Sequence, residues 1–109
     1  MVVDQTVQLV PGQSSVIPFQ PIQGASSDLK RDVTLLVDAV PGADVFICDS
    51  DNLEAYRSNN WPSFRYYLGG TGLVDYNKSL RLANIRYHMI IVCNNVHGGL
   101  VRVKVTASK

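Results

Sequence analysis

The sequence of 109 residues is poor in charge: charged residues make up 17% of the chain, and the formal net charge is only +1. Without an excess of basic residues, the protein has no broad electrostatic field that attracts nucleic acid or an anionic membrane surface. The basic residues are also scattered, with Lys30 and Arg31 the only adjacent pair. We therefore expect no nucleic-acid partner.

Cysteine is scarce, and long hydrophobic runs are missing. Two cysteines, Cys48 and Cys93, are too few for a disulfide scaffold. Each ends a hydrophobic segment, so they either bridge neighbouring strands or are two small buried side chains. No apolar run approaches the roughly 20 residues of a membrane span, and the first residues lack the features of a signal peptide. These absences predict no membrane span and leave the compartment open.

The sequence also lacks catalytic and phosphate-binding motifs. The glycine-rich stretch 69–72 is not followed by the Lys-Ser/Thr pair of a phosphate-binding loop, and it is typical of a flexible turn. A thiol nucleophile near His88 or His97 would need a lowered pKa and a cleft. Cys93 instead continues the side of its segment that we expect to face inward. We predict that the protein is not an enzyme.

What the chain does contain is a series of short hydrophobic segments separated by turn residues. Residues 32–39 and 101–107 alternate apolar and polar side chains, which is typical of strands with one face in water. Residues 43–49 and 87–95 contain almost continuous apolar runs and indicate two central strands buried on both faces. The pattern predicts a core that contains Val45, Ile47, Met89, Ile91, Val103 and Val105.

About seven or eight such segments, with turn signals roughly every 8–12 residues, predict an all-β fold. We expect one domain over residues 1–109, an antiparallel β-sandwich with a jelly-roll-like arrangement, with a small barrel as the alternative. Residues 40–43 are predicted to form a hairpin turn, and residues 64–68, 73–76 and 80–85 three separate short strands. The only helical signal follows residue 50, where Asp51 and Glu54 have the spacing of a capping box.

Two stretches carry a resemblance to known domains: Asp-Val-Phe-Ile-Cys-Asp-Ser-Asp-Asn-Leu-Glu-Ala-Tyr (residues 44–56) and Tyr-His-Met-Ile-Ile-Val-Cys-Asn-Asn (residues 87–95). With the valine-rich last strand, this order resembles the β-sandwich domains of the bacterial pre-peptidase C-terminal kind and the GOLD (Golgi dynamics) domains. The chain has Asn84-Ile85-Arg86 where those domains have a Gly-Thr turn. The resemblance implies a non-catalytic binding or accessory domain and carries no catalytic residues.

The densest aromatic patch lies between the two central strands and supplies our candidate binding residues. Aromatic rings interleaved with arginine suit contact with a protein or a glycan. The alternative is that alternate members, such as Phe64 and Tyr66 against Arg65 and Tyr67, simply divide between core and surface. The candidate set is Tyr56, Arg57, Trp61, Phe64, Arg65 and Tyr67.

A second candidate is a calcium site formed by Asp49, Asp51 and Asn94, since carboxylate and amide oxygens are the ligands that Ca²⁺ prefers. The EF-hand pattern fails at Leu53 and Asn60, so these side chains could equally cap a helix or form turns. Our first functional hypothesis is an interaction module with a protein or glycan partner and no required cofactor. The alternatives are a calcium-dependent binding domain and a structural subunit of a larger assembly, with the oligomeric state open.

Overall fold

The structure is a computed structural model that describes residues 3–21, 30–59, 61–93 and 98–108, with the main chain alone at residues 9, 41, 61 and 108. Within these ranges, six antiparallel strands form one sheet, and an α-helix and a short 3-10 helix lie between the third and fourth strands. The elements are β1 (Val3–Leu9), β2 (Ser14–Phe19), β3 (Lys30–Cys48), α1 (Ser50–Arg57), η1 (Trp61–Ser63), β4 (Leu68–Ala83), β5 (Tyr87–Val92) and β6 (Gly99–Ser108). The predicted all-β antiparallel sandwich with one short α-helix is confirmed.

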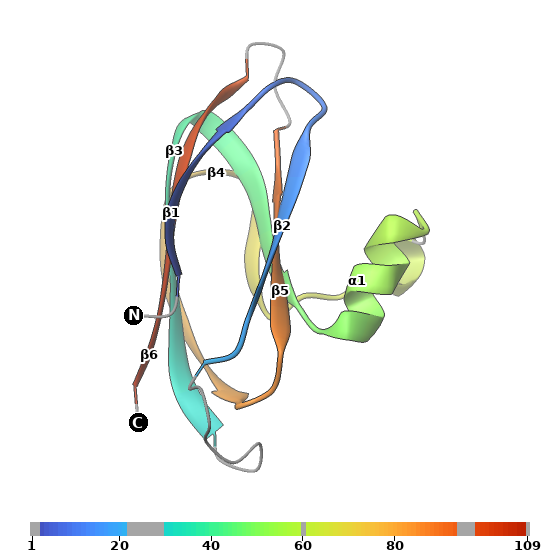
Figure 1. The fold of residues 1–109 in the computed structure, drawn as a ribbon, viewed down its shortest axis with the longest axis vertical. Coiled ribbons are helices and arrows are strands. Elements are labelled where there is room, and N and C mark those ends of the chain that lie inside the picture. The colour runs from blue at the N-terminus through green and yellow to red at the C-terminus, as the bar shows by residue number, and fades with distance from the viewer. Residues whose placement is uncertain (1–2, 22–29, 60, 94–97, 109) are drawn as a thin grey trace.

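The sheet folds into two facing leaves because β3 and β4 are long enough to belong to both. The first half of β3 pairs with β6, its second half pairs with β5, and β4 runs beside both halves. One leaf is therefore β1–β6–β3–β4, and the other is β2–β5–β3–β4. Figure 1 shows β3 passing over the top of the molecule from one leaf to the other. The result is a sandwich that closes nearly into a barrel.

The main core lies between the two leaves and consists almost entirely of aliphatic side chains. The alternating strands 32–39 and 101–107 turn their apolar side chains inward, as predicted, and Val33, Leu35 and Val103 are completely buried. All six residues that we expected in the core are fully buried: Val45, Ile47, Met89, Ile91, Val103 and Val105. Period-two alternation locates these strands because one face of each is in water.

The predicted hairpin turn at residues 40–43 is wrong. The chain continues through this segment as part of β3, and the pairing with β4 shifts register between Asp38 and Ala43 and again before Val45. Gly42 has a φ of 154°, a backbone conformation that favours glycine. The Pro-Gly pair therefore bends a strand from one leaf to the other, and it does not reverse the chain.

The three short strands predicted after residue 63 are also wrong, since residues 68–83 form the single strand β4. The glycine run that indicated a flexible turn lies inside this strand. Gly69 has a φ of 116°, and a Cβ atom at this position would lie 1.9 Å from the carbonyl oxygen of Val45. The glycine is there because the two strands approach too closely for any side chain.

Strand β2 contains Pro18 and lies at the edge of the sheet, since it pairs only with β5 in the described part of the chain. Among the residues that the structure describes, no helix has the length and apolar character needed to cross a membrane.

Candidate binding surface around helix α1

Helix α1 starts directly after β3, and Asp49 is the residue that caps it. The carboxylate of Asp49 accepts hydrogen bonds from the backbone N–H and the side-chain amide of Asn52, at 3.0 and 2.8 Å. The predicted capping box with Asp51 as N-cap is therefore wrong, because Asp51 lies in the first turn of the helix. Both aspartates are good caps by residue type, so their spacing alone could not decide between them.

A second, smaller hydrophobic cluster holds α1 against the outer face of the β2–β5–β3–β4 leaf, on the side away from β1 and β6 (Figure 1). The helix contributes Leu53, and the sheet contributes Phe46 and Ile90. Phe64 is buried in this cluster, and its ring meets that of Phe46 edge to face at 5.5 Å. Tyr56 is half-buried against the same cluster. Phe64, predicted as a binding residue, therefore has a packing role.

The remaining described members of the aromatic patch lie at the surface. Arg57, Arg65, Tyr66 and Tyr67 are all exposed, and the two tyrosines are 46% and 42% exposed. The ring of Tyr66 packs 4.9 Å from that of Phe46. Arg65 donates hydrogen bonds to the carbonyls of Pro62 and Phe64, at 3.0 and 2.8 Å. The side chains of Arg65 and Tyr66 are thus both accessible and held in position.

Trp61, the sixth member of the predicted set, lies in η1, and its side chain falls outside the part of the structure that is described. Of the other five, Phe64 is buried, Tyr56 is half-buried, and the remaining three are exposed. The predicted division of the patch between core and surface therefore applies to part of it. Tyr66, which was not in the predicted set, is the most exposed aromatic side chain that is described.

Tyr67 connects the aromatic patch to the capping aspartate. Its hydroxyl donates a hydrogen bond of 3.1 Å to the second carboxylate oxygen of Asp49, and its ring meets the buried ring of Tyr87 edge to face at 5.6 Å. Burial, this hydrogen bond and the charge of Asp49 raise the pKa of Tyr67. Burial, followed by Tyr67 and Asp49, raises the pKa of Tyr87 to about 12. Both tyrosines are therefore neutral hydrogen-bond donors at neutral pH.

The start of β5 brings a group of polar residues to the same place, because Cys48 pairs with His88 across β3 and β5. The side chains of Ser50 and His88 share a hydrogen bond of 3.2 Å. Burial lowers the pKa of His88, and the nearby charges of Arg57 and Arg86 lower it further. A hollow of about 340 Å³ beside the helix start is lined by Asp49, Ser50, Asp51, Ile85 and Arg86.

Sequence reasoning missed Ser50, Ile85, Arg86 and His88 as members of this surface. These residues could have been identified by assuming that the two central strands pair antiparallel. This pairing places the beginning of one strand beside the end of the other, whereas the calcium hypothesis placed both strand ends together. In the structure, the last residue of β5, Val92, pairs with Asp44 at the far end from Asp49.

The predicted calcium ligands are in different situations. Both carboxylate oxygens of Asp49 are engaged, one by Asn52 and the other by Tyr67. Asp51 is exposed, and Asn94 lies outside the described residues. No three His, Cys, Asp or Glu side chains come together as metal ligands within the described ranges. The calcium site stays a prediction that the described residues do not test.

The two cysteines are buried as thiols, in agreement with the simpler of the two expectations. Burial raises the pKa of Cys48 to about 11, and the charge of Asp49 adds to this shift. A thiol with a raised pKa carries almost no thiolate at neutral pH and is a poor nucleophile. Cys48 therefore serves as a small packing residue under α1.

Asp49 should make the stability of the protein pH-dependent. Burial acts to raise its pKa, but the hydrogen bonds from Asn52 and Tyr67 outweigh burial, and the pKa of Asp49 lies below its usual range. A carboxylate with a lowered folded-state pKa adds stability above the unfolded-state pKa of about 3.9 and loses it as the pH falls through the folded-state value. We expect the difference in thermal midpoint between wild type and Asp49→Asn to shrink below about pH 4.

The measurement is thermal unfolding of wild type, Asp49→Asn and Asp49→Ala at a series of pH values. Asparagine can still cap the helix, so Asp49→Ala should cost more at neutral pH, about 0.5–2 kcal/mol. Asp51→Asn is the matched control, because it removes an exposed carboxylate two positions further along. If the difference in thermal midpoint between wild type and Asp49→Asn stays constant down to the most acidic pH, the lowered pKa of Asp49 is contradicted.

In comparisons with known proteins, neither a protein-family model nor a curated protein matches the chain.

Proposed function

We propose that the chain is a non-catalytic interaction module that binds a protein or glycan partner. The binding surface is the aromatic–arginine surface, by which we mean the exposed Arg57, Arg65, Tyr66 and Tyr67 beside α1. One observation carries the proposal: Tyr66 and Tyr67 are each more than two-fifths exposed, yet each ring is held by packing below it.

Rings fixed in this way suit binding because little side-chain entropy is lost when a partner covers them. Tyr66 packs on Phe46 and Phe64, at ring-centre distances of 4.9 and 6.0 Å. Tyr67 has both its edge-to-face contact with Tyr87 and its hydrogen bond to Asp49. Tyrosine and arginine are also the residue types enriched where interfaces gain most of their energy.

The resemblance to pre-peptidase C-terminal and GOLD domains supports the same proposal, since it implies a binding or accessory role. The surface lies on a rigid two-leaf sandwich, in the connection between β3 and β4. Binding residues are often found on such connections, because the scaffold fixes their positions without depending on them for its own core.

The test measures ligand selection and then loss of binding. A phage-displayed random peptide library and a printed panel of oligosaccharides are screened against the wild-type protein, one probe for each class of partner. We expect Tyr66→Ala and Tyr67→Ala to weaken the selected ligands by about 2 kcal/mol each, as for interface anchors. Val10→Ala is the control, because Val10 is 58% exposed in a different connection.

Thermal unfolding of each variant separates lost binding from lost stability. Tyr67→Phe keeps the ring and removes only the hydroxyl that bonds to Asp49, so it should retain most of the binding. Ligands that bind Tyr66→Ala and Tyr67→Ala as tightly as wild type would place the partner elsewhere and contradict the proposal.

A further inference from the structure

The β1–β6–β3–β4 leaf lies on the opposite side of the molecule from α1 (Figure 1). Its outer face contains an apolar hollow of about 450 Å³. Val40 and Leu100 are directly opposite each other across β3 and β6, and they are 70% and 55% exposed. Val74, 52% exposed, joins them where the pairing of β3 and β4 shifts register. Leu36 on β3 is half-buried beside them. Aliphatic side chains clustered on an outward face indicate a contact surface.

The charged residues around the hollow are sorted by strand. Arg102 and Lys104 lie on β6, and Asp38 and Asp75 lie on β3 and β4. Asp38 and Asp75 are directly opposite each other, which is an unfavourable arrangement for like charges. The Nε atom of Arg102 lies 3.5 Å from a carboxylate oxygen of Asp4 on β1, although Asp38 is its neighbour on β3. Neither Asp38 nor Asp75 has an ion-pair partner among the residues that the structure describes.

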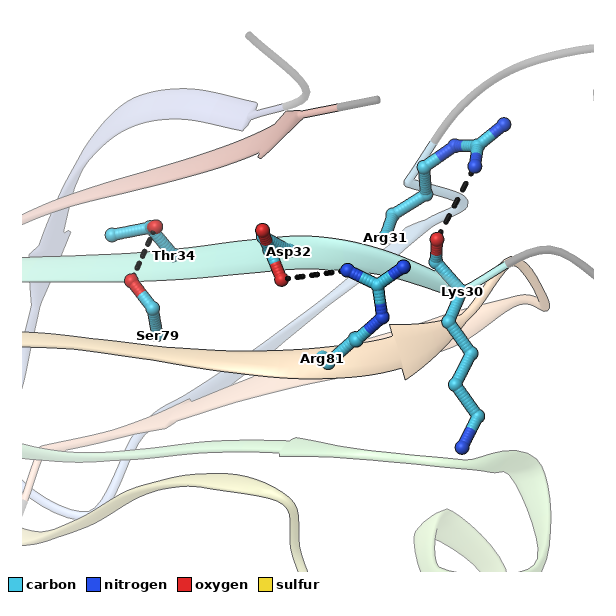
Figure 2. A network of polar contacts seen from close by, with 6 residues as sticks. All are labelled: Lys30, Arg31, Asp32, Thr34, Ser79 and Arg81. Carbon is cyan, nitrogen blue, oxygen red and sulfur yellow. Dashed lines mark hydrogen bonds and ion pairs between the residues drawn. The ribbon is translucent and has the colours of Figure 1, made fainter.

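The other end of the same face is different, because its polar groups pair with one another. Figure 2 shows Asp32 beside Arg81, at 3.4 Å, and the hydroxyls of Thr34 and Ser79, which share a hydrogen bond of 2.6 Å. These cross-strand pairs are complete within one copy of the chain. At the hollow, by contrast, Asp38 on β3 lies between Asp75 on β4 and Arg102 on β6, and the aliphatic pair of Val40 and Leu100 lies two positions further along β3 and β6.

We propose that this face binds a second copy of the chain, face to face, about a two-fold axis that runs parallel to the strands between β6 and β3. This axis places β6 of one copy over β3 of the other. Leu100 of each copy then lies over Val40 of the other, and Arg102 lies over Asp38. The exposed aliphatic side chains of the two copies cover each other, and Asp38 of each copy gains Arg102 of the other.

A second copy is favoured over another partner because the face is complementary to itself. An isologous interface needs one patch that supplies both halves of every contact. Here β6 supplies the cations and β3 the anion in adjacent strands of one sheet, so a single rotation satisfies both. Sheets stacked in this way lie about 10 Å apart, a distance that aliphatic side chains of this size fill.

The experiment is sedimentation equilibrium of the wild type and of charge-reversed variants over a wide concentration range. One variant carries Asp38→Lys with Asp75→Lys, the second carries Arg102→Glu with Lys104→Glu, and the third carries all four changes. We expect a wild-type dimer, and at least about tenfold weaker dimerisation in each of the first two variants. An equimolar mixture of the first two should form a heterodimer, and the third variant should again form a homodimer.

Recovery of dimerisation in the mixture and in the third variant separates weaker association from misfolding, since a misfolded variant would not regain dimerisation when the second variant is added. Reversal of Arg81 to Glu is the matched control, because Arg81 is an exposed arginine on the same face that already pairs with Asp32. It should leave dimerisation unchanged. A wild type that is monomeric at every concentration, or either of the first two variants dimerising as wild type does, would overturn the proposal. A dimer that survives the reversals uses another face.

Discussion

Replacing Gly69 by alanine should destabilise the protein by roughly 2–5 kcal/mol, since it combines a strained backbone with an overpacked contact. The added Cβ atom would lie 1.9 Å from the carbonyl oxygen of Val45 and 2.9 Å from its carbonyl carbon. These are backbone atoms of a central strand, so they cannot move aside as a flexible side chain could. The φ of 116° adds strain for any residue with a side chain. Chemical denaturation gives the free energy of unfolding directly.

Gly70→Ala is the matched control for this prediction. At the neighbouring glycine, a Cβ atom would meet only a methyl carbon of Leu73, at an ordinary contact distance of 3.5 Å. We expect Gly70→Ala to change the free energy of unfolding by less than about 1 kcal/mol. Equal effects of the two substitutions would mean that the close approach of β4 to β3 at Gly69 is not as the structure has it.

Truncation of Ile91 to alanine should cost roughly 2–5 kcal/mol. Ile91 is completely buried between the two leaves, and it lies opposite Val45 on β3 and Ser15 on β2. The loss includes the transfer energy of the removed methyl and methylene groups and the cost of the cavity that remains. The measurement is again the free energy of unfolding in denaturant.

Ile85→Ala is the control, because it removes the same atoms from a side chain that is 38% exposed and lies between β4 and β5. Its effect should stay below about 1 kcal/mol, as for substitutions away from the core. An Ile91→Ala protein as stable as Ile85→Ala would show that β5 does not form the centre of the second leaf.

The parts of the fold that could be predicted from the sequence are those where burial changes from one residue to the next. Val33 to Ala39 and Val101 to Ala107 each have one wet face, so their alternation identifies the strand and its inner side together. Glycine and proline carry no such information, because the same residues serve a turn and a close approach between strands. The segments 40–43 and 69–72 were therefore predicted as turns, although strand pairing decides their conformation.

The candidate site could be located but not assembled from the sequence. The aromatic and arginine content of residues 56–67 indicated a candidate surface, which the structure places in the connection between β3 and β4. Periodicity could not tell which rings face outward, because residues 64–67 belong to neither a strand nor a helix. The contact of Tyr67 with Asp49 joins residues 18 positions apart and depends on how α1 packs against the sheet. Such a contact follows from the tertiary structure and has no local sequence signal.

The two long strands that pass through both leaves also determine how the protein can come apart. Each leaf has a ladder of its own, β1 with β6 in one and β2 with β5 in the other, but both leaves are joined to the same strand, because β3 pairs with β6 in its first half and with β5 in its second. Separating the strands of one leaf would also disrupt the pairing of β3 in the other leaf. We therefore expect no partly unfolded state in which one leaf stays intact. The protein should therefore melt as one cooperative unit, with the slowest amide exchange along β3.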